Sequence, residues 1–342
     1  MIRIFKTGRH AHRSPLSYPA LAPLFAGAVE TVDRPEQADL YLFAHSLDVE
    51  AAPEALVRDW RQRRRPVVLL SEEPFWDTIW TGQPLAREIW LETSWGALPA
   101  VQLNHSTSRI FRFRRIPYYL LTSHRFANAY RWRFSRNAAR SEAEWRAHFA
   151  ACRAETVFMF ERRPERRHDV CWEAAGITGL CAWRTRLAEA CGPRAERLGR
   201  SWQPGMPRRQ ALPDWHLDKL VRLDGHASSL AAIENTHHPD YVTEKFFDAM
   251  ACGSRPLYWA AAGHRIHEFG VPPEAWLNLH GQDAAAAADS LGAPFADAGF
   301  LAAWREGQQR LAELFNDTGV LVAERERLRR DVLAELHKIL QL

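Results

Sequence analysis

Several features that would assign this chain to a protein class at once are missing from it. The five cysteines form no CxxC pair and are odd in number, which indicates neither a disulfide framework nor a zinc site and favours a reducing cytoplasm. No run of about 18 apolar residues occurs, so no membrane-spanning helix is expected. The sequence also contains no Asp-x-Asp, the pair with which many transferases hold a diphosphate through Mg²⁺ or Mn²⁺.

A strong excess of one charge is missing as well. The 342 residues carry a net charge of +4, which fits a phosphorylated ligand or an acidic membrane surface without requiring nucleic acid. The arginine clusters lack the interleaved aromatic residues of a nucleic-acid-binding module, so we expect no nucleic-acid partner. Since 46% of the residues are hydrophobic, the chain can build the cores of two domains of ordinary size.

The best-defined pattern is a strand, a polar loop, a helix and a second strand. Residues 228–234 are small and apolar and predict a buried strand. Thr243 can cap a helix over residues 243–252, and Gly253 can end it. Residues 255–259 predict a second buried strand, so the whole stretch predicts a βαβ unit in a parallel sheet.

The loop of this unit carries the densest chemistry in the chain. In open parallel sheets, ligands bind between the carboxyl end of a strand and the amino end of the next helix, where N–H groups favour a phosphate. Lys245 adds a positive charge there, and Glu244 can accept hydrogen bonds from sugar hydroxyls. This mixture suits a nucleotide diphosphate.

The motif resembles that of a known family. Residues 234–236 (Glu-Asn-Thr), 240–245 (Asp-Tyr-Val-Thr-Glu-Lys), Gly253 and 256–259 (Pro-Leu-Tyr-Trp) closely resemble the donor-binding motif of the α-1,3-fucosyltransferases, glycosyltransferase family ten. The resemblance implies a GT-B fold, in which two Rossmann-like α/β domains with parallel sheets face each other across a cleft. It also implies inverting, metal-independent transfer of L-fucose from GDP-β-L-fucose to a glycan hydroxyl.

The resemblance further implies roles for particular residues of the donor site. Asn235, Tyr241 and Glu244 would hold the nucleoside, and Lys245 would hold the phosphates. The family places a further phosphate-binding arginine at the start of a helix, which selects Arg184. Three other arginines remain competitors for that role: Arg166, Arg167 and Arg186.

Two carboxylates lie at the end of a predicted strand in the amino-terminal half. Glu72 and Glu73 follow the apolar residues 67–71 and precede Pro74. The family carries its general base before a small residue and a proline, which points to Glu72, with Glu73 in the neighbouring position. The alternative is an acidic pair that stabilises a helix start through the helix dipole.

Acceptor contacts are predicted less directly. Trp76 follows the two carboxylates, and tryptophan faces stack on sugar rings, although most of the 14 tryptophans are expected to be core residues. Asn104 and Arg109 match a second family stretch that is expected near the cleft. The alternative for that stretch is a basic surface loop.

The pattern of alternating strands and helices predicts the domain organisation. Residues 1–153 are expected to form an acceptor-binding Rossmann-like domain and residues 154–318 the donor domain. Within the first, we predict a strand over residues 2–6, a helix over 18–29 and an amphipathic helix over 49–65. Residues 319–342 predict a helix that packs back on the first domain, or else one that lies on a membrane surface.

Two other functions remain open. His226-Ala227-Ser228 stands where the family usually has a Tyr-Lys-Phe-like segment, which leaves room for another GDP-sugar as donor. A non-catalytic relative that binds nucleotides or glycans is the second alternative. The chain lacks the amino-terminal membrane helix of animal relatives and resembles the bacterial type without one. We therefore expect a cytoplasmic enzyme, with possible peripheral contact to the inner face of the membrane, and a lipopolysaccharide or capsule sugar as acceptor.

Overall fold

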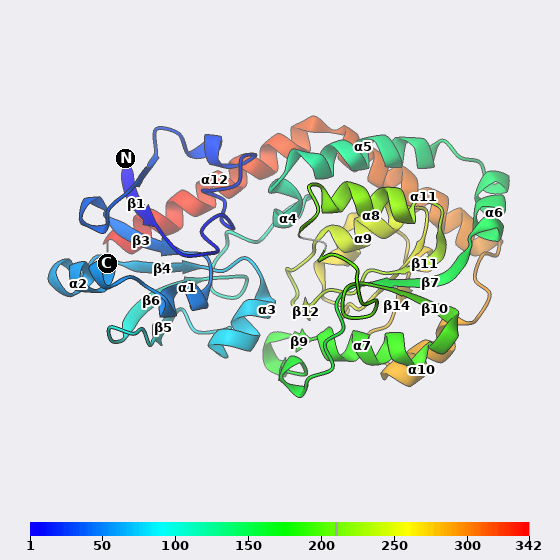
Figure 1. The fold of residues 1–342 in the computed structure, drawn as a ribbon. Coiled ribbons are helices and arrows are strands. Elements are labelled where there is room, and N and C mark those ends of the chain that lie inside the picture. Colours follow the sequence, from blue (N-terminus) through cyan, green and yellow to red (C-terminus); the bar gives the residue numbers. More distant parts are fainter. Residues whose placement is uncertain (209–210, 342) are drawn as a thin grey trace. The chain divides into compact units, whose positions relative to one another are not determined.

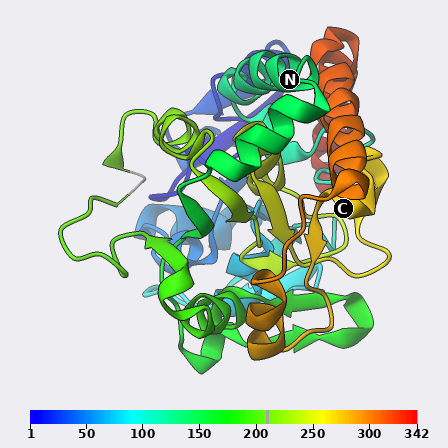
Figure 2. The same cartoon turned by 90° about the vertical axis from the view of Figure 1, so that its right-hand side faces the viewer.

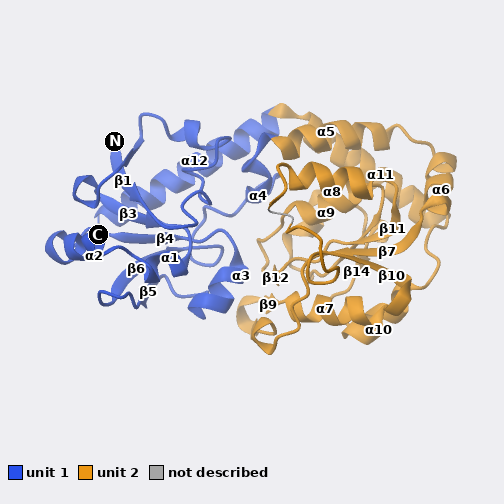
Figure 3. Ribbon diagram, viewed as in Figure 1, with its two compact units in different colours: residues 1–124, 319–342 blue, residues 125–318 orange. Residues whose placement is uncertain are grey.

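The computed structural model describes residues 1–208 and 211–341. Internal contacts divide the chain into two compact units, residues 1–124 with 319–342 and residues 125–318 (Figure 3). Residues 125–153, which we expected in the first domain, group with the second unit. The carboxyl-terminal segment groups with the first unit; Leu342, the end of the predicted helix, lies outside the described residues.

Unit 1 is built on a six-stranded sheet in the order β2-β1-β3-β4-β6-β5 (Figure 1). All neighbouring strands are parallel except β5 and β6, which are antiparallel. The strands are β1 Ile2–Lys6, β2 Val29–Val32, β3 Leu40–Phe43, β4 Val67–Leu70, β5 Glu88–Leu91 and β6 Leu98–Leu103. Every residue of β3 and β4 is buried, as expected for central strands of a parallel sheet.

Short helices lie between these strands and after the last of them. They are α1 Ser46–Glu50, α2 Glu54–Arg63, α3 Pro74–Trp76, a π-helical turn Asp77–Thr81 and α4 Tyr118–Leu121. Helix α2 packs Leu56, Val57 and Trp60 into the same core as Tyr41 and Phe43 of β3. This core explains why the amphipathic pattern was readable in the sequence.

Two of our predictions for unit 1 were wrong. Residues 18–29 do not form one helix; they contain a 3-10 turn, Ala22–Phe25, and lead into β2. Pro19 and Pro23 lack the N–H groups that a continuous helix needs. The helix predicted over residues 49–65 is likewise split into α1 and α2, and Pro53 stands at the start of α2.

Helix α12, Thr318–Gln341, is the last described element. It buries Leu328, Val332 and Leu336. Within unit 1, its Glu324 carboxylate accepts hydrogen bonds from the backbone N–H groups of Arg114 and Arg115. Of the helices in the described part of the chain, none is both long and apolar enough to cross a bilayer.

Unit 2 contains a five-stranded parallel sheet in the order β10-β7-β11-β13-β14. Its strands are β7 Ala154–Met159, β10 Ala195–Leu198, β11 Ala227–Ala231, β13 Arg255–Tyr258 and β14 Leu277–Asn278. A smaller antiparallel sheet joins β8 Cys171–Trp172, β9 Ile177–Gly179 and β12 Thr236–His237. Both sheets help to position the candidate site, because the polar loop follows β11 of the larger sheet and contains β12 of the smaller one.

Helices cover both faces of the larger sheet. The helices are α5 His124–Ala138, α6 Glu142–Ala151, α7 Cys181–Ala190, α8 Trp215–Leu223, α9 Glu244–Ala251, α10 Ala284–Leu291 and α11 Ala298–Asn316. Helices α7 and α10 lie side by side on one face, and α8 and α9 lie on the other (Figures 1 and 2). This layering confirms the predicted α/β class with parallel sheets.

The predicted βαβ unit is present as β11, α9 and β13. Gly253 ends α9 with a φ of +75°, a left-handed conformation that glycine adopts without strain. A β-carbon at this position would also lie only 2.6 Å from Nε2 of His148. The predicted cleft concerns the mutual placement of the two units and stays a prediction.

Candidate functional site

The polar loop of unit 2 lies between β11 and α9 and is held by a second element. The backbone N–H of Leu180, just before α7, donates to the carbonyl of Asn235 at 2.9 Å. Thr236 and His237 pair with Thr178 and Gly179 in the small sheet. These bonds join the start of α7 to the loop that was predicted to bind a ligand.

The buried carboxylate of Glu234 links the beginning of the loop to the first residues of α9. Oε1 of Glu234 accepts hydrogen bonds from the backbone N–H and the hydroxyl of Thr243, at 2.9 and 2.8 Å. Nζ of Lys245 lies 2.7 Å from the other oxygen of Glu234 and 2.9 Å from the Thr243 hydroxyl. Thr243 does occupy the N-cap position, but its side chain bonds to Glu234 instead of capping α9.

In this cluster, burial and neighbouring charges shift the pKa values of the side chains in opposite directions. Burial lowers the pKa of Lys245, but Glu234 and Glu244 outweigh it and hold that pKa above its ordinary value. Burial raises the pKa of Glu234, and Lys245 only partly offsets the effect. For Glu244, the opposing charges of Lys245 and Lys219 outweigh burial and lower the pKa. The helix start therefore presents a protonated lysine flanked by carboxylates.

Arg184 of α7 lies beside the same strand end. It is 2% exposed, and its Nη1 donates to the carbonyl of Ile233 at 3.1 Å. Its guanidinium carbon lies 4.5 Å from the centre of the Phe160 ring. Nε has no hydrogen-bond partner among the described residues. Burial lowers the pKa of Arg184, and the nearby charge of Glu234 offsets this effect only in part, so the guanidinium is a buried cation with incomplete charge compensation.

The competing arginines are placed differently. Arg186 forms an ion pair with Asp169 at 2.7 Å, and both side chains are exposed. Arg166 and Arg167 are exposed in a 3-10 turn. Of the four candidates, Arg184 is the one whose guanidinium bonds to the end of the strand that leads into the loop.

The other two predicted donor residues belong to the loop itself. Asn235 is half-buried, and its side-chain oxygen lies 3.9 Å from Sγ of Cys181. Tyr241 is buried, and its backbone N–H donates to the carbonyl of His238. The structure thus brings Arg184, Asn235, Glu244 and Lys245 to one edge of the unit 2 sheet, with Tyr241 in the same loop.

Two uncharged histidines stabilise the loop through hydrogen bonds and ring packing. Nδ1 of His237 lies 2.8 Å from the carbonyl of Gly176, while Nε2 accepts from the backbone N–H of Ala261. Its ring centre lies 4.9 Å from that of His264. Burial lowers the pKa of His237 to about 4 and that of His264 to about 3. Both imidazoles are therefore uncharged at neutral pH and act as packing and hydrogen-bonding groups.

Unit 1 holds the second candidate cluster, at the carboxyl end of β4. Glu72 accepts hydrogen bonds from Nε of Arg13 at 2.7 Å, from the Tyr18 hydroxyl at 2.8 Å and from the Tyr118 hydroxyl at 3.0 Å. Arg13 also donates to Glu73. Glu72 and Glu73 are thus bridged by one guanidinium, which donates a charge-assisted hydrogen bond to each carboxylate.

Trp76 packs against this cluster. The Arg13 guanidinium carbon lies 4.5 Å from the centre of its ring, and the ring of His45 lies 4.6 Å away. Trp76 is 8% exposed, so most of its surface is used in packing. Asp77, next in the chain, is fully buried, and burial raises its pKa well above the ordinary value.

Asn104 and Arg109, the remaining acceptor candidates, lie elsewhere in unit 1. The Asn104 side chain accepts from the backbone N–H groups of Ser106 and Thr107 and donates to the carbonyl of Pro84. It thereby holds a turn, which is a structural role. Arg109 is exposed and lines a cavity of about 590 Å³ against α12.

Four residues of the two clusters were missing from our predicted site. Arg13, Tyr18 and Tyr118 surround Glu72, and Glu234 pairs with Lys245. Arg13 and Tyr18 lie more than fifty residues before Glu72, so no local pattern connects them. Glu234 lies within the matched donor motif, and its presence there was the available signal.

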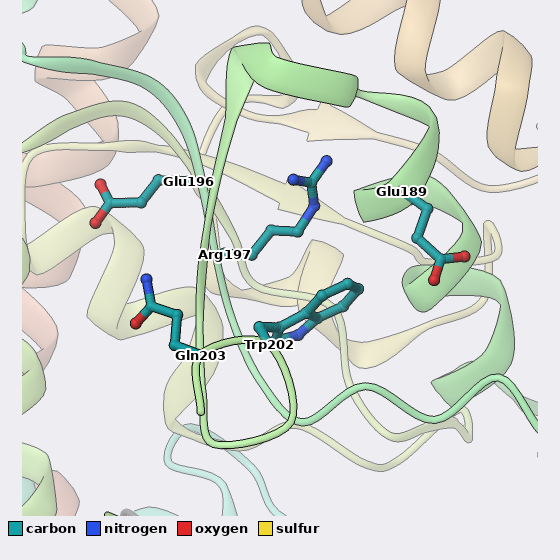
Figure 4. A pocket seen from close by; sticks show the side chains of 5 residues that line it. All are labelled: Glu189, Glu196, Arg197, Trp202 and Gln203. Atoms are coloured by element: carbon teal, nitrogen blue, oxygen red, sulfur yellow. The ribbon is translucent and has the colours of Figure 1, made fainter. Parts of the chain in front are cut away.

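A cavity of about 530 Å³ opens along the edge strand β10 (Figure 4). It is lined by Glu189, Glu196, Arg197, Trp202 and Gln203. Arg197 already donates to the carbonyls of Ala188 and Gly192, and the Trp202 indole donates to the carbonyl of Phe160. No predicted site residue lines this cavity, and we assign it no part in the reaction.

Comparison with known protein families gives a match that includes the polar loop of unit 2. The family model described as glycosyltransferase family 10 (fucosyltransferase), C-terminal, matches residues 219–291. The match includes β11, the polar loop, α9 and β13, whose residues carry the family resemblance, and it confirms that resemblance.

Two solved structures were also similar. One is a crystal structure of an α1,3-fucosyltransferase with GDP-fucose, with 12% sequence identity and a TM-score of 0.41. The other is a crystal structure of an α1,3-fucosyltransferase, with 12% identity and a TM-score of 0.42. Each match covers 100% of this chain and 90% of the other. At these scores we base no conclusion on the likeness.

Proposed function

Because residues 219–291 match the model of the carboxyl-terminal part of glycosyltransferase family 10, we propose that this chain transfers L-fucose from GDP-fucose to a hydroxyl group of a glycan. The observation that carries the proposal is the family match, which contains the polar loop and Lys245 at the start of α9. Arg184 of α7 lies outside the match and bonds to the carbonyl of Ile233, just before the loop. The reaction is inverting, so a β-linked donor gives an α-linked product.

The donor's diphosphate needs positive charge at the moment it leaves. As the bond between the anomeric carbon and the phosphate oxygen breaks, its electron pair departs with GDP. Lys245, Arg184 and the N–H groups at the start of α9 are fixed donors that stabilise this charge. Asn235, Tyr241 and Glu244 hold the nucleoside. With these groups in place, the reaction requires no metal ion.

Glu72 is the general base of the proposed reaction. The acceptor oxygen attacks the anomeric carbon, and its proton passes to a carboxylate that must be ionised beforehand. The Arg13 guanidinium and two phenol hydroxyls donate hydrogen bonds to this carboxylate and fix its position. Glu73 is bound by the same arginine and assists in holding it.

The departure of His226-Ala227-Ser228 from the family pattern does not favour another donor sugar. His226 precedes β11, and its Nε2 lies 2.6 Å from Glu196. This segment lies at the amino end of β11, whereas the loop of the predicted donor site follows the carboxyl end. The substitution therefore lies one strand length away from the proposed sugar contacts.

The test is a transfer assay with the purified chain. GDP-fucose is supplied together with lipopolysaccharide and capsule oligosaccharides in the presence of EDTA, and released GDP and the configuration of the product are measured. We expect GDP release that depends on the acceptor, with an α-fucosyl product. Transfer from a different nucleotide sugar, or GDP binding without turnover on any acceptor, would replace this proposal by one of its alternatives.

A further inference from the structure

The side chain of Glu72 is fully buried, with 0% of it exposed. Among the described residues, Arg13, Tyr18 and Tyr118 donate hydrogen bonds to it, and the single hydroxyl proton of Tyr18 is shared between the two oxygens of Glu72. A carboxylate that is buried under three side chains cannot itself touch an acceptor hydroxyl in this conformation. The proton must reach it through one of the groups that cover it.

The three covering groups differ in whether they can carry a proton. The Arg13 guanidinium stays protonated and has no lone pair to accept another proton. The Tyr118 hydroxyl can both donate and accept, but Tyr118 is 4% exposed and lies within the unit 1 core. Tyr18 is half-buried, and its hydroxyl lies within 3.0 Å of both oxygens of Glu72. Of the three covering groups, Tyr18 combines an exchangeable proton and an oxygen that can accept one with a side chain that is only half-buried.

We propose that Tyr18 relays the proton from the acceptor hydroxyl to Glu72. This inference rests on the fucosyl transfer proposed above. As the acceptor oxygen forms its bond to the anomeric carbon, its proton moves to the Tyr18 oxygen, and the Tyr18 proton moves to Glu72. The electron pair of the broken bond leaves with GDP, so Tyr18 ends the step unchanged and Glu72 ends it protonated.

Hydrogen bonds fix the loop that carries Tyr18, as a proton relay requires. The Tyr18 backbone N–H donates to the carbonyl of Ser14, and its own carbonyl accepts from Leu21 and Ala22. The Ser17 hydroxyl donates to the carbonyl of Ala11, and Nζ of Lys6 donates to that hydroxyl. Burial and the Glu72 charge raise the pKa of Tyr18, so its phenol enters the reaction protonated and aimed at the base.

Tyr118 supplies a matched control. Tyr18→Phe and Tyr118→Phe each remove phenol donation to Glu72 and leave an aromatic ring in place. In the wild-type assay with GDP-fucose and a working acceptor, we expect Tyr18→Phe to lower kcat by about 100-fold or more, the scale of general acid–base catalysis. The KM for GDP-fucose should stay within about twofold. Tyr118→Phe, which only positions Glu72, should lose about tenfold at most.

The outcomes separate this inference from the function on which it rests. If wild-type enzyme consumes no GDP-fucose, the proposed function fails first. If wild-type enzyme is active and both variants lose kcat equally, or Tyr18→Phe loses less than about fivefold, the relay is wrong and the transferase stands. Wild-type enzyme gives a second test if Tyr18→Phe does not fold. Single-turnover rates in mixtures of H₂O and D₂O should show the curved dependence of two moving protons; a linear or flat dependence overturns the relay.

Discussion

Nζ of Lys245 lies 2.7 Å from Oε2 of Glu234, and this ion pair joins the two ends of the proposed donor loop. Glu234 is buried, while the Lys245 side chain is 20% exposed. The pair gives the lysine a partner inside the protein before any nucleotide arrives. Its charge can then be shared with a diphosphate without a large movement of the backbone.

Variants of Lys245 and Glu234 can separate what this ion pair contributes to the stability of the fold from what it contributes to GDP binding. Lys245→Ala leaves the Glu234 carboxylate buried and unpaired, so we expect the free energy of unfolding to fall by about 2 kcal/mol. GDP affinity should fall about 10- to 100-fold through the lost charge-assisted bonds. Adding Glu234→Gln should recover much of the stability but none of the affinity. Urea unfolding and calorimetric titration measure the two effects; wild-type affinity in the double variant would remove Lys245 from the donor site.

Arg184 should show the opposite relationship between stability and binding. Its guanidinium is buried, and Nε has no hydrogen-bond partner among the described residues; such incompletely paired cations cost stability where they have no ligand. Replacement by an apolar chain of similar length, Arg184→Met, is expected to raise the free energy of unfolding by about 1 kcal/mol. The same change should weaken GDP binding at least about tenfold.

The matched control for Arg184 lies two residues further along α7. Arg186→Met removes an exposed ion pair with Asp169 and should change stability and GDP affinity little. Equal losses of affinity in the two variants would show that α7 contributes general positive charge and not a specific phosphate contact.

The two adjacent carboxylates of unit 1 should differ in their effect on turnover. Glu72→Gln keeps the shape of the side chain but removes the charge that accepts a proton, so the transfer rate should fall by about 1000-fold. GDP affinity should be unchanged because the nucleotide is proposed to bind in unit 2. Glu73 accepts a hydrogen bond from Arg13 and none from the phenol hydroxyls that bond to Glu72 among the described residues, so Glu73→Gln should retain most of the rate. A larger loss in Glu73→Gln would make Glu73 the base.

Acid should destabilise the protein through His237 and His264. Burial lowers the pKa of both below the ordinary value of about 6.5, so the folded state favours the neutral rings. Their contribution to stability is complete above about pH 6.5 and is lost as the pH falls toward about 4 for His237 and about 3 for His264. Each neutral ring contributes a slope of up to about 1.4 kcal/mol per pH unit in that window.

Urea unfolding between pH 8 and pH 5 measures this slope. His237→Gln should make the dependence of stability on pH shallower than in wild type. His12→Gln, at an exposed position, controls for the loss of a histidine as such. An unchanged slope in His237→Gln would mean that its ring is not held neutral by the fold.

The βαβ unit was predictable because its signals are local. Small apolar residues before Glu234, the phenylalanines of α9 and the glycine at 253 each determine the backbone within a few positions. Residues 18–29 were predicted as a helix because the small apolar residues were weighted above Pro19 and Pro23. The antiparallel β5–β6 pair was missed, since β5 exposes Trp90 and lacks the burial of the central strands.

The surroundings of Glu72 could not be predicted from the sequence. The strand-end position of Glu72 was readable, but its partners come from the loop after β1 and from the start of α4. Only the fold brings Arg13, Tyr18 and Tyr118 together around one carboxylate. Arg184 was selected by the family resemblance, and its bond to the carbonyl of Ile233 became visible only in the structure.

The most direct test of this account is a calorimetric titration of the wild-type chain with GDP, UDP, CDP and ADP in buffer containing EDTA. We predict that GDP binds in the micromolar range and at least about tenfold more tightly than the other three, and that the Glu234→Gln/Lys245→Ala variant loses this binding. Absence of GDP binding by the wild-type chain, or equal binding by the variant, would contradict the assignment of the nucleotide to the start of α9.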